Sequence, residues 1–168
     1  MKTVIRTLLL LSLIVWLGAE IFFPVVAAVT FGQLAPDTHA AGQIVGALLR
    51  ILHGMGMVCG VVLLALLALA PAWGIFKSRS VLAPMVLALI MLALTAYSQY
   101  GIIPAMERDR LQASGGVIDS LPADSPARMD FNALHRRSTN VEGGVVLLGL
   151  AVIALVAYAE TAAAKRIG

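Results

Sequence analysis

The chain has 168 residues, of which 60% are hydrophobic and only 12% are charged, and its mean hydropathy is +0.94. A soluble domain of this length cannot bury so large an apolar fraction, which excludes that class of protein. The net charge of +3 does not indicate a nucleic-acid partner, because the basic residues stand singly or in pairs at the ends of apolar runs. Such placement is typical of membrane proteins, where these residues set topology and contact lipid headgroups.

Four apolar runs divide the chain, and each is long enough to cross a bilayer as a helix, which takes about 20 residues. We therefore predict an all-α integral membrane protein, a four-helix transmembrane bundle that forms a single domain over residues 1–168. The spans are expected at residues 7–30, 41–70, 81–103 and 139–162. The first run follows Lys2 and Arg6 as in a signal peptide, but it is longer than an h-region, so an uncleaved helix is expected.

The connection at residues 107–137 is the only long one, and it is polar, with five acidic and five basic side chains. Within it Ser114, Gly115 and Gly116 are expected to end the third helix. Ser125 followed by Pro126 is typical of a helix start. We expect a short amphipathic helix at the membrane interface before the last span.

Lysine and arginine residues near the span ends favour one orientation. Six lie at the two termini and in the second connection, the first connection has none, and the long connection has five. The empty first connection favours both termini in the cytoplasm, with the long connection outside. The expected location is the cell inner membrane.

Ionisable and polar side chains within the spans are candidates for function, because an unpaired charge there costs at least about 2.5–3.5 kcal/mol. Helix rise places these groups in the same half of the bilayer. The expected intramembrane polar cluster consists of Glu20, Arg50, His53, Tyr97, Tyr100 and Glu142. The expected mouth of the bundle carries His135, Ser138 and Asn140.

Matched depth predicts that Glu20 and Arg50 interact directly or through one water, with His53 as a third member. Helical spacing places Gly46, Arg50 and His53 on one stripe with Met57 and Gly60, and a second stripe runs through the fourth span. Two GxxxG patterns in the second run would let helices approach closely, so both stripes are expected to face protein. The GxxxG pairs are Gly42 with Gly46 and Gly56 with Gly60.

Three interpretations of this cluster remain open. It is a structural ion pair, a working polar site, or a metal site with His53, Met57 and His135 as candidate ligands of the kind that copper prefers. A haem between His53 and His135 has suitable ligand types but no supporting motif. No cofactor is therefore predicted. Phosphate-binding loops, nucleophile elbows and HExxH motifs are absent from the sequence, which favours a protein that is not an enzyme.

Several segments resemble a known family. They are WLGAEIFFPVVAAVTF in the first span, AGQIVGALLRILH in the second, YGIIPAMERDR and DFNALHRRSTN. They are similar to a bacterial family of domain-of-unknown-function four-helix membrane proteins, which looks related to the eukaryotic transmembrane protein associated with cisplatin resistance. The resemblance covers nearly the whole chain. It implies a four-helix membrane protein without an established biochemical activity and no catalytic residues to carry over.

Two classes of function are therefore expected. In the first, the chain is a small transport, resistance or metal- or cation-handling component with its polar cluster around a cavity. In the second, it is a structural or accessory subunit of a larger membrane complex, or a haem-binding electron-transfer subunit. The expected partners are the lipid bilayer, and other membrane subunits or a second copy that pack on the glycine-rich helix faces.

Overall fold

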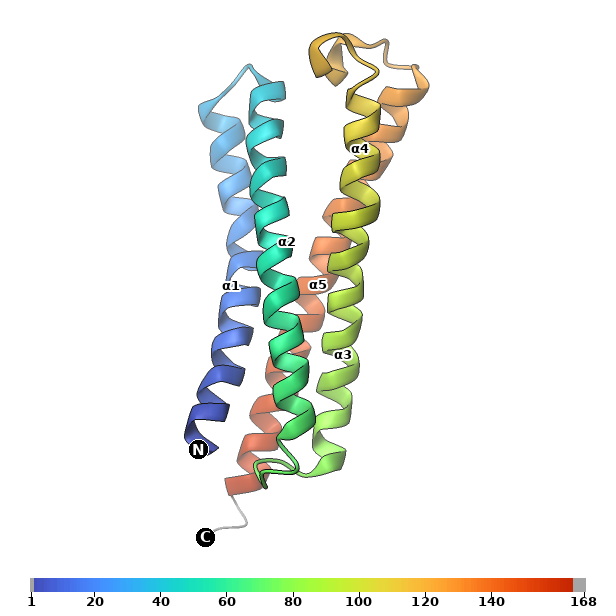
Figure 1. Cartoon of the computed structure of the whole chain (residues 1–168). Helices are drawn as coiled ribbons and strands as arrows, with labels where there is room; N and C mark the ends of the chain where they lie inside the picture. Colours follow the sequence, from blue (N-terminus) through green and yellow to red (C-terminus); the bar gives the residue numbers. More distant parts are fainter. Residues whose placement is uncertain (1, 165–168) are drawn as a thin grey trace.

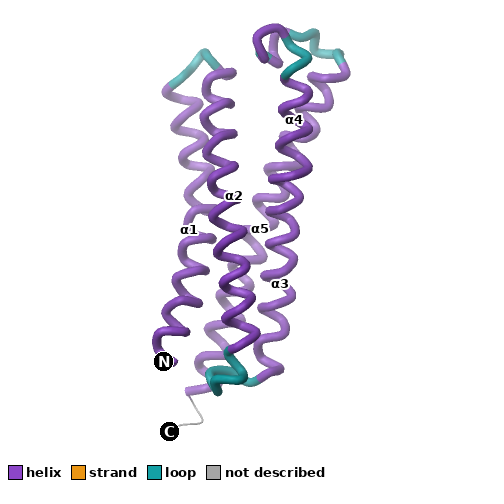
Figure 2. Tube along the Cα trace, in the orientation of Figure 1, coloured by secondary structure: helices purple, strands orange, loops and turns teal. Residues whose placement is uncertain are grey.

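A computed structural model describes the backbone of residues 2–164 and the side chains up to residue 161. This part of the chain is an elongated bundle of helices without strands (Figures 1 and 2). Four of its helices are long and apolar enough to cross a membrane. The predicted all-helical, four-span architecture is confirmed.

The helices run nearly end to end through the sequence. Their order is α1 (Lys2–Gln33), α2 (Thr38–Leu69), α3 (Ser78–Tyr97), a π-helical turn η1 (Ser98–Ile102), α4 (Ile103–Arg110), two 3₁₀ turns η2 (Ser114–Gly116) and η3 (Ile118–Ser120), and α5 (Pro126–Ala164). Each spanning helix exceeds the apolar run that predicted it. The fourth extends furthest, because α5 begins at Pro126, ahead of the predicted span, and in the third α3, η1 and α4 form one rod over Ser78–Arg110.

The long connection is ordered largely as the sequence predicts. Gly115 and Gly116 take φ values of 63° and 73°, a left-handed conformation that glycine adopts without steric cost, and the third rod has ended before them. Ser125 accepts a hydrogen bond at 3.4 Å from the backbone N–H of Arg128, so it caps α5. The expected amphipathic segment is helical, but it is continuous with the fourth span, because no helix-breaking residue separates them.

The helices pack around the bundle in the order α1, α2, α3, α5. The buried core lies in the half nearest the connection between α2 and α3, where Leu9 and Leu13 meet Leu63 and Leu67. Toward the other end, α4 packs against α5, and within the described residues it has no extensive contact with α1 or α2. The pair α1–α2 therefore separates from the pair α4–α5 at the end that carries the long connection (Figure 1).

Trp16 on α1 fills a groove on α2 that two glycines create. The indole is 1% exposed. A Cβ atom at Gly56 would lie 2.5 Å from its Nε1, and one at Gly60 would lie 2.8 Å from its Cζ3. At this GxxxG pair the close approach is therefore that of an aromatic ring to the α2 backbone.

Candidate functional site

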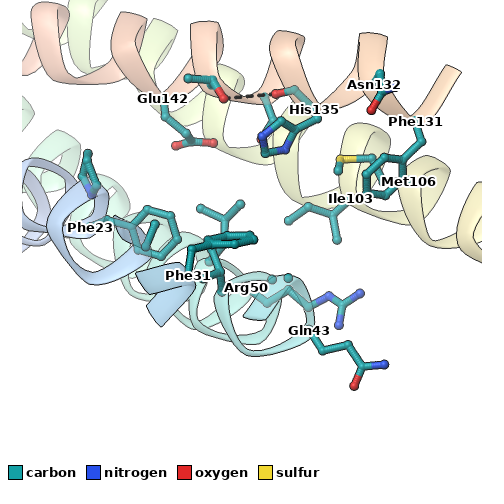
Figure 3. A pocket seen from close by; sticks show the side chains of 18 of the residues that line it. Phe23, Phe31, Gln43, Arg50, Ile103, Met106, Phe131, Asn132, His135 and Glu142 are labelled. Atoms are coloured by element: carbon teal, nitrogen blue, oxygen red, sulfur yellow. Dashed lines mark hydrogen bonds between the residues drawn. The ribbon is translucent and has the colours of Figure 1, made fainter. Parts of the chain in front are cut away.

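A cleft of about 1470 Å³ occupies the space between the separated helix pairs. Side chains from α1 and α2 line one side, and side chains from α4 and α5 line the other (Figure 3). Aromatic rings of Phe23, Phe31 and Phe131 form part of an otherwise largely apolar wall. Four carboxylates also line the cleft, and two of them, Glu20 and Glu142, lie deep in the bundle. The cleft is therefore an apolar chamber with acidic groups deep within the bundle.

A hydrogen-bonded network surrounds His53 at the inner end of the cleft. His53 is fully buried, and its Nε2 lies 2.9 Å from Oε1 of Glu142. Its Nδ1 lies 3.1 Å from Oε1 of Gln99. The hydroxyl of Ser98 donates to the same Glu142 oxygen at 2.9 Å. These four side chains connect α2, η1 and α5 through polar contacts within an apolar bundle.

Glu20 is the fifth member of this cluster and the least satisfied one. It is 2% exposed, and its Oε1 has no hydrogen-bond partner. It lies within Coulombic range of Glu142 and His53, and Oε2 of Glu142 is also without a partner. Two carboxyl groups with unused oxygens thus stand near one imidazole beside the cleft. We call Glu20, His53, Ser98, Gln99 and Glu142 the buried cluster.

Arg50 does not belong to this cluster, so the predicted Glu20–Arg50 pair is wrong. Arg50 is paired with Glu107 of α4 at 3.6 Å, and both side chains are about half exposed. Arg110 lies 3.8 Å from the same carboxylate and stacks over the ring of Phe131. Glu20 and Arg50 are at similar depth in their helices, which is why the pair was predicted. The long Arg50 side chain, however, extends along the cleft toward its mouth. Figure 3 shows its guanidinium at the α4 side.

Tyr97 and Tyr100 also lie outside the buried cluster, contrary to expectation. Tyr97 is 46% exposed and Tyr100 is 70% exposed. The phenol oxygen of Tyr97 accepts a hydrogen bond at 3.3 Å from Arg137. Their neighbours Ser98, which is buried, and Gln99, which is half-buried, contact Glu142 and His53 instead. Gln99 was recognisable in the sequence as a polar residue of the third span, but neither residue was included in the expected cluster.

Ser98 lies on the buried face of α3, because the buried residues Met91, Thr95 and Ser98 follow one another at intervals of four and three. Tyr97 and Tyr100 lie off that face and are exposed. A π-helical turn begins at Ser98: in η1 the backbone N–H of Ile103 donates to the carbonyl of Ser98, five residues earlier, so one extra residue enters the turn. Pro104 follows directly, and its ring, which would clash with a carbonyl of a regular preceding turn, is accommodated by the wider turn.

The three residues predicted at the bundle mouth all line the cleft. They are His135, Ser138 and Asn140. Ser138 is buried, and His135 projects from α5 into the space opposite α1 and α2 (Figure 3). Their stripe continues inward through Glu142 to the buried Val145, so this face of α5 points toward protein.

The candidate metal ligands are not brought together in the part of the chain that the structure describes. No group of three or more His, Cys, Asp and Glu side chains there has an arrangement suited to a metal ion. Both ring nitrogens of His53 are engaged by Gln99 and Glu142. His135 lies on the cleft wall, and neither copper nor haem gains a supporting observation from its position.

Comparison with known proteins yields one match. Residues 11–114 match the family described as Domain of unknown function (DUF4149). This region includes most of α1 and all of α2, α3 and α4, and therefore Glu20, His53, Ser98 and Gln99, whereas Glu142 lies beyond it. No curated protein matches. No solved structure matches either.

Proposed function

The chain belongs to the DUF4149 family, whose function is unknown, and from the geometry of the buried cluster we propose that it is a small membrane transport or resistance component that handles cations. One observation carries the proposal. Glu20 is buried beside the cleft, and one of its carboxyl oxygens has no hydrogen-bond partner.

The charges of the buried cluster support this proposal. It contains two carboxyl groups and one imidazole, so protonation of His53 balances only one carboxylate. The two arginines of the cleft wall, Arg50 and Arg110, are already paired with Glu107. Leaving the second carboxylate charged and unpaired within the membrane costs at least about 2.5–3.5 kcal/mol. That carboxyl group must therefore hold a proton or a cation, which is the chemistry of a cation-coupled transport site.

Replacing Glu20 by glutamine is expected to abolish proton movement through the protein, because the amide has nearly the same shape but cannot exchange a proton. The measurement uses the full chain in liposomes that contain a pH-sensitive dye and experience an imposed pH gradient. The wild type should dissipate the gradient faster than empty liposomes do, and Glu20→Gln should return the rate to that of empty liposomes.

Glu160→Gln provides the matched control for this experiment. Glu160 pairs with Arg6 at 3.3 Å at the opposite end of the bundle and does not line the cleft. This variant should keep the wild-type rate. Equal rates for Glu20→Gln and the wild type would exclude Glu20 as the exchanging group.

We also propose that the chain lies in the cell inner membrane with both termini in the cytoplasm. The start of α1, the α2–α3 connection and the last turns of α5 share one end of the bundle, as the contacts Lys2–Gly74 and Arg6–Glu160 indicate (Figure 1). In a Cys59→Ala background, Asp124→Cys should react with an impermeant maleimide on intact cells. Lys77→Cys should react only after permeabilisation, and the reverse pattern would invert the topology.

A second candidate function is that of an accessory subunit of a larger membrane complex. Gly18 and Gly54 favour this function. A Cβ atom at either position would meet nothing within 4 Å, so no other part of the chain packs against these glycines and a partner helix could do so. Under either proposal the role is non-enzymatic. We also propose, from sequence resemblance alone, that the chain is related to the eukaryotic transmembrane protein associated with cisplatin resistance.

A further inference from the structure

We propose that the cleft binds a lipophilic organic cation, with apolar rings against its walls and the positive charge directed toward Glu20 and Glu142. This inference rests on the proposed cation-handling function and adds the chemical class of the ligand. Three properties of the cleft carry it: its size, the composition of its walls, and the position of its unsatisfied carboxylates.

The size of the cleft exceeds the needs of an inorganic ion. Its volume of about 1470 Å³ compares with about 300–1,000 Å³ for ordinary small-molecule sites and about 30 Å³ for one water molecule. Hard cations also require a shell of six to eight oxygen ligands, which apolar walls do not provide. The chamber therefore suits an organic molecule with substantial apolar surface.

One face of α1 combines the two chemistries that such a molecule needs. Glu20, Phe23, Ala27 and Phe31 follow one another at intervals of three and four residues, and all four line the cleft. Proceeding from the buried cluster to the mouth, a ligand would meet a carboxylate, then an aromatic ring, a small residue and a second ring. Aromatic faces attract organic cations through their quadrupoles.

The opposite wall already holds a cation on an aromatic ring. The guanidinium carbon of Arg110 lies 5.4 Å from the centre of the Phe131 ring. Met106, which also lines the cleft, lies beside the Phe131 ring (Figure 3). A planar or multi-ring cation fits the same type of surface on the α1 side.

The charges of the cleft distinguish this ligand from a phospholipid. At the mouth, Arg50 and Arg110 share the single carboxylate of Glu107, which leaves one net positive charge there, so a lipid phosphate would be attracted to the mouth and not to the inner end of the cleft. The acidic groups deeper in the cleft, Glu20 and Glu142, would repel an anion. Glu20 has an unused oxygen and is 2% exposed, so a positive group that enters through the cleft would supply the partner that this oxygen lacks.

Tetraphenylphosphonium and tetraphenylborate provide the test, because these two ions have nearly the same shape and opposite charge. Equilibrium dialysis of each ion against the full chain in non-ionic detergent, with empty micelles subtracted, measures their binding. The phosphonium ion should bind saturably and the borate should not. Glu20→Gln should weaken phosphonium binding by at least about tenfold, because the unpaired buried carboxylate is lost. Equal binding of both ions would overturn the proposal.

Gly46→Leu separates this inference from the proposed function. Gly46 lines the cleft about two turns outward from His53, and a Cβ atom there would meet nothing within 4 Å, so a leucine side chain narrows the cleft without disturbing the fold. It should reduce phosphonium binding by at least about tenfold while proton movement persists. Gly54→Leu, on the same helix and outside the cleft lining, is the control and should bind as the wild type does.

The two failures give different results. If Glu20→Gln stops proton movement but phosphonium binding is absent or insensitive to Gly46→Leu, the ligand class is wrong and the cation-handling function stands. If the phosphonium ion binds in the cleft and proton movement is unchanged in Glu20→Gln, the ligand class stands and Glu20 does not exchange protons. Retained folding of each variant is checked by gel filtration in the same detergent.

Discussion

Replacing Gly56 or Gly60 by alanine is expected to destabilise the bundle by about 1–3 kcal/mol, which is the usual cost of overpacking a close-packed interior. At Gly56 a Cβ atom would lie 2.5 Å from Nε1 of Trp16, and at Gly60 it would lie 2.8 Å from Cζ3 of the same ring. The indole cannot retreat, because it is 1% exposed and lies in the core cluster with Leu9 and Leu13. The measurement is the temperature at which half of the protein is lost from the monodisperse gel-filtration peak in detergent.

Gly54→Ala is the matched control for this pair, and its effect is expected to have the opposite sign. It lies on the same helix, and nothing stands within 4 Å of its Cβ position. Alanine is favoured over glycine in a helix by up to about 1 kcal/mol, so this variant should be neutral or slightly stabilised. A loss as large in Gly54→Ala as in Gly56→Ala would contradict this explanation, because alanine would then destabilise α2 where it has no contact with Trp16.

The membrane spans and the close helix approach on α2 could be predicted from the sequence, but the residue that fills the approach could not. The spans were predictable because each apolar run exceeds the bilayer requirement of about 20 residues, and their number and order are confirmed. The glycines at positions 56 and 60 were recognisable as a site of close approach. That an indole from α1 fills it was not, because the GxxxG spacing specifies a groove and does not specify its occupant.

The buried cluster was only partly predictable, because the sequence indicates the depth of a residue along its helix but not the direction in which its side chain points. A rise of about 1.5 Å per residue placed Glu20, Arg50 and His53 at similar depth, and that was sufficient to select Glu20 and His53. The partner of a side chain also depends on the rotation of its helix about the helix axis and on the length of the side chain. In the structure Arg50 therefore pairs with Glu107. A single sequence contains no measure of how α1 and α2 are rotated toward each other.

The remaining difference, Ser98 and Gln99 in place of Tyr97 and Tyr100, follows the regular helical spacing of α3. Ser98 continues the buried stripe of Met91 and Thr95, and the two tyrosines lie beside that stripe and are exposed. Pro104 indicates the altered turn that begins at Ser98, because a proline inside an apolar run disturbs the turn before it.

The coupling between His53 and Glu142 is expected to be the largest of any charged pair in the bundle, at about 1–3 kcal/mol in a double-mutant cycle. His53 is fully buried, and its contact with Glu142 is 2.9 Å long. Removing one partner leaves the other with an unpaired polar group in an apolar interior, whereas removing both avoids that penalty. The cycle compares His53→Leu, Glu142→Leu and the double variant by unfolding in mixed micelles.

Two further double-mutant cycles test whether Arg50 pairs with Glu107, as in the structure, or with Glu20, as helix depth alone suggests. The Arg50–Glu107 pair is 3.6 Å long and about half exposed, so its coupling should be about 0–1 kcal/mol. Glu20 and Arg50 have no direct contact, and their cycle should show additive losses within about 0.5 kcal/mol. A Glu20–Arg50 coupling larger than that of His53 with Glu142 would restore the depth-based pairing and remove the unpaired carboxylate on which the cation site depends. The expected ranking instead leaves Glu20 as a buried acid whose missing partner must come from a proton or a bound cation.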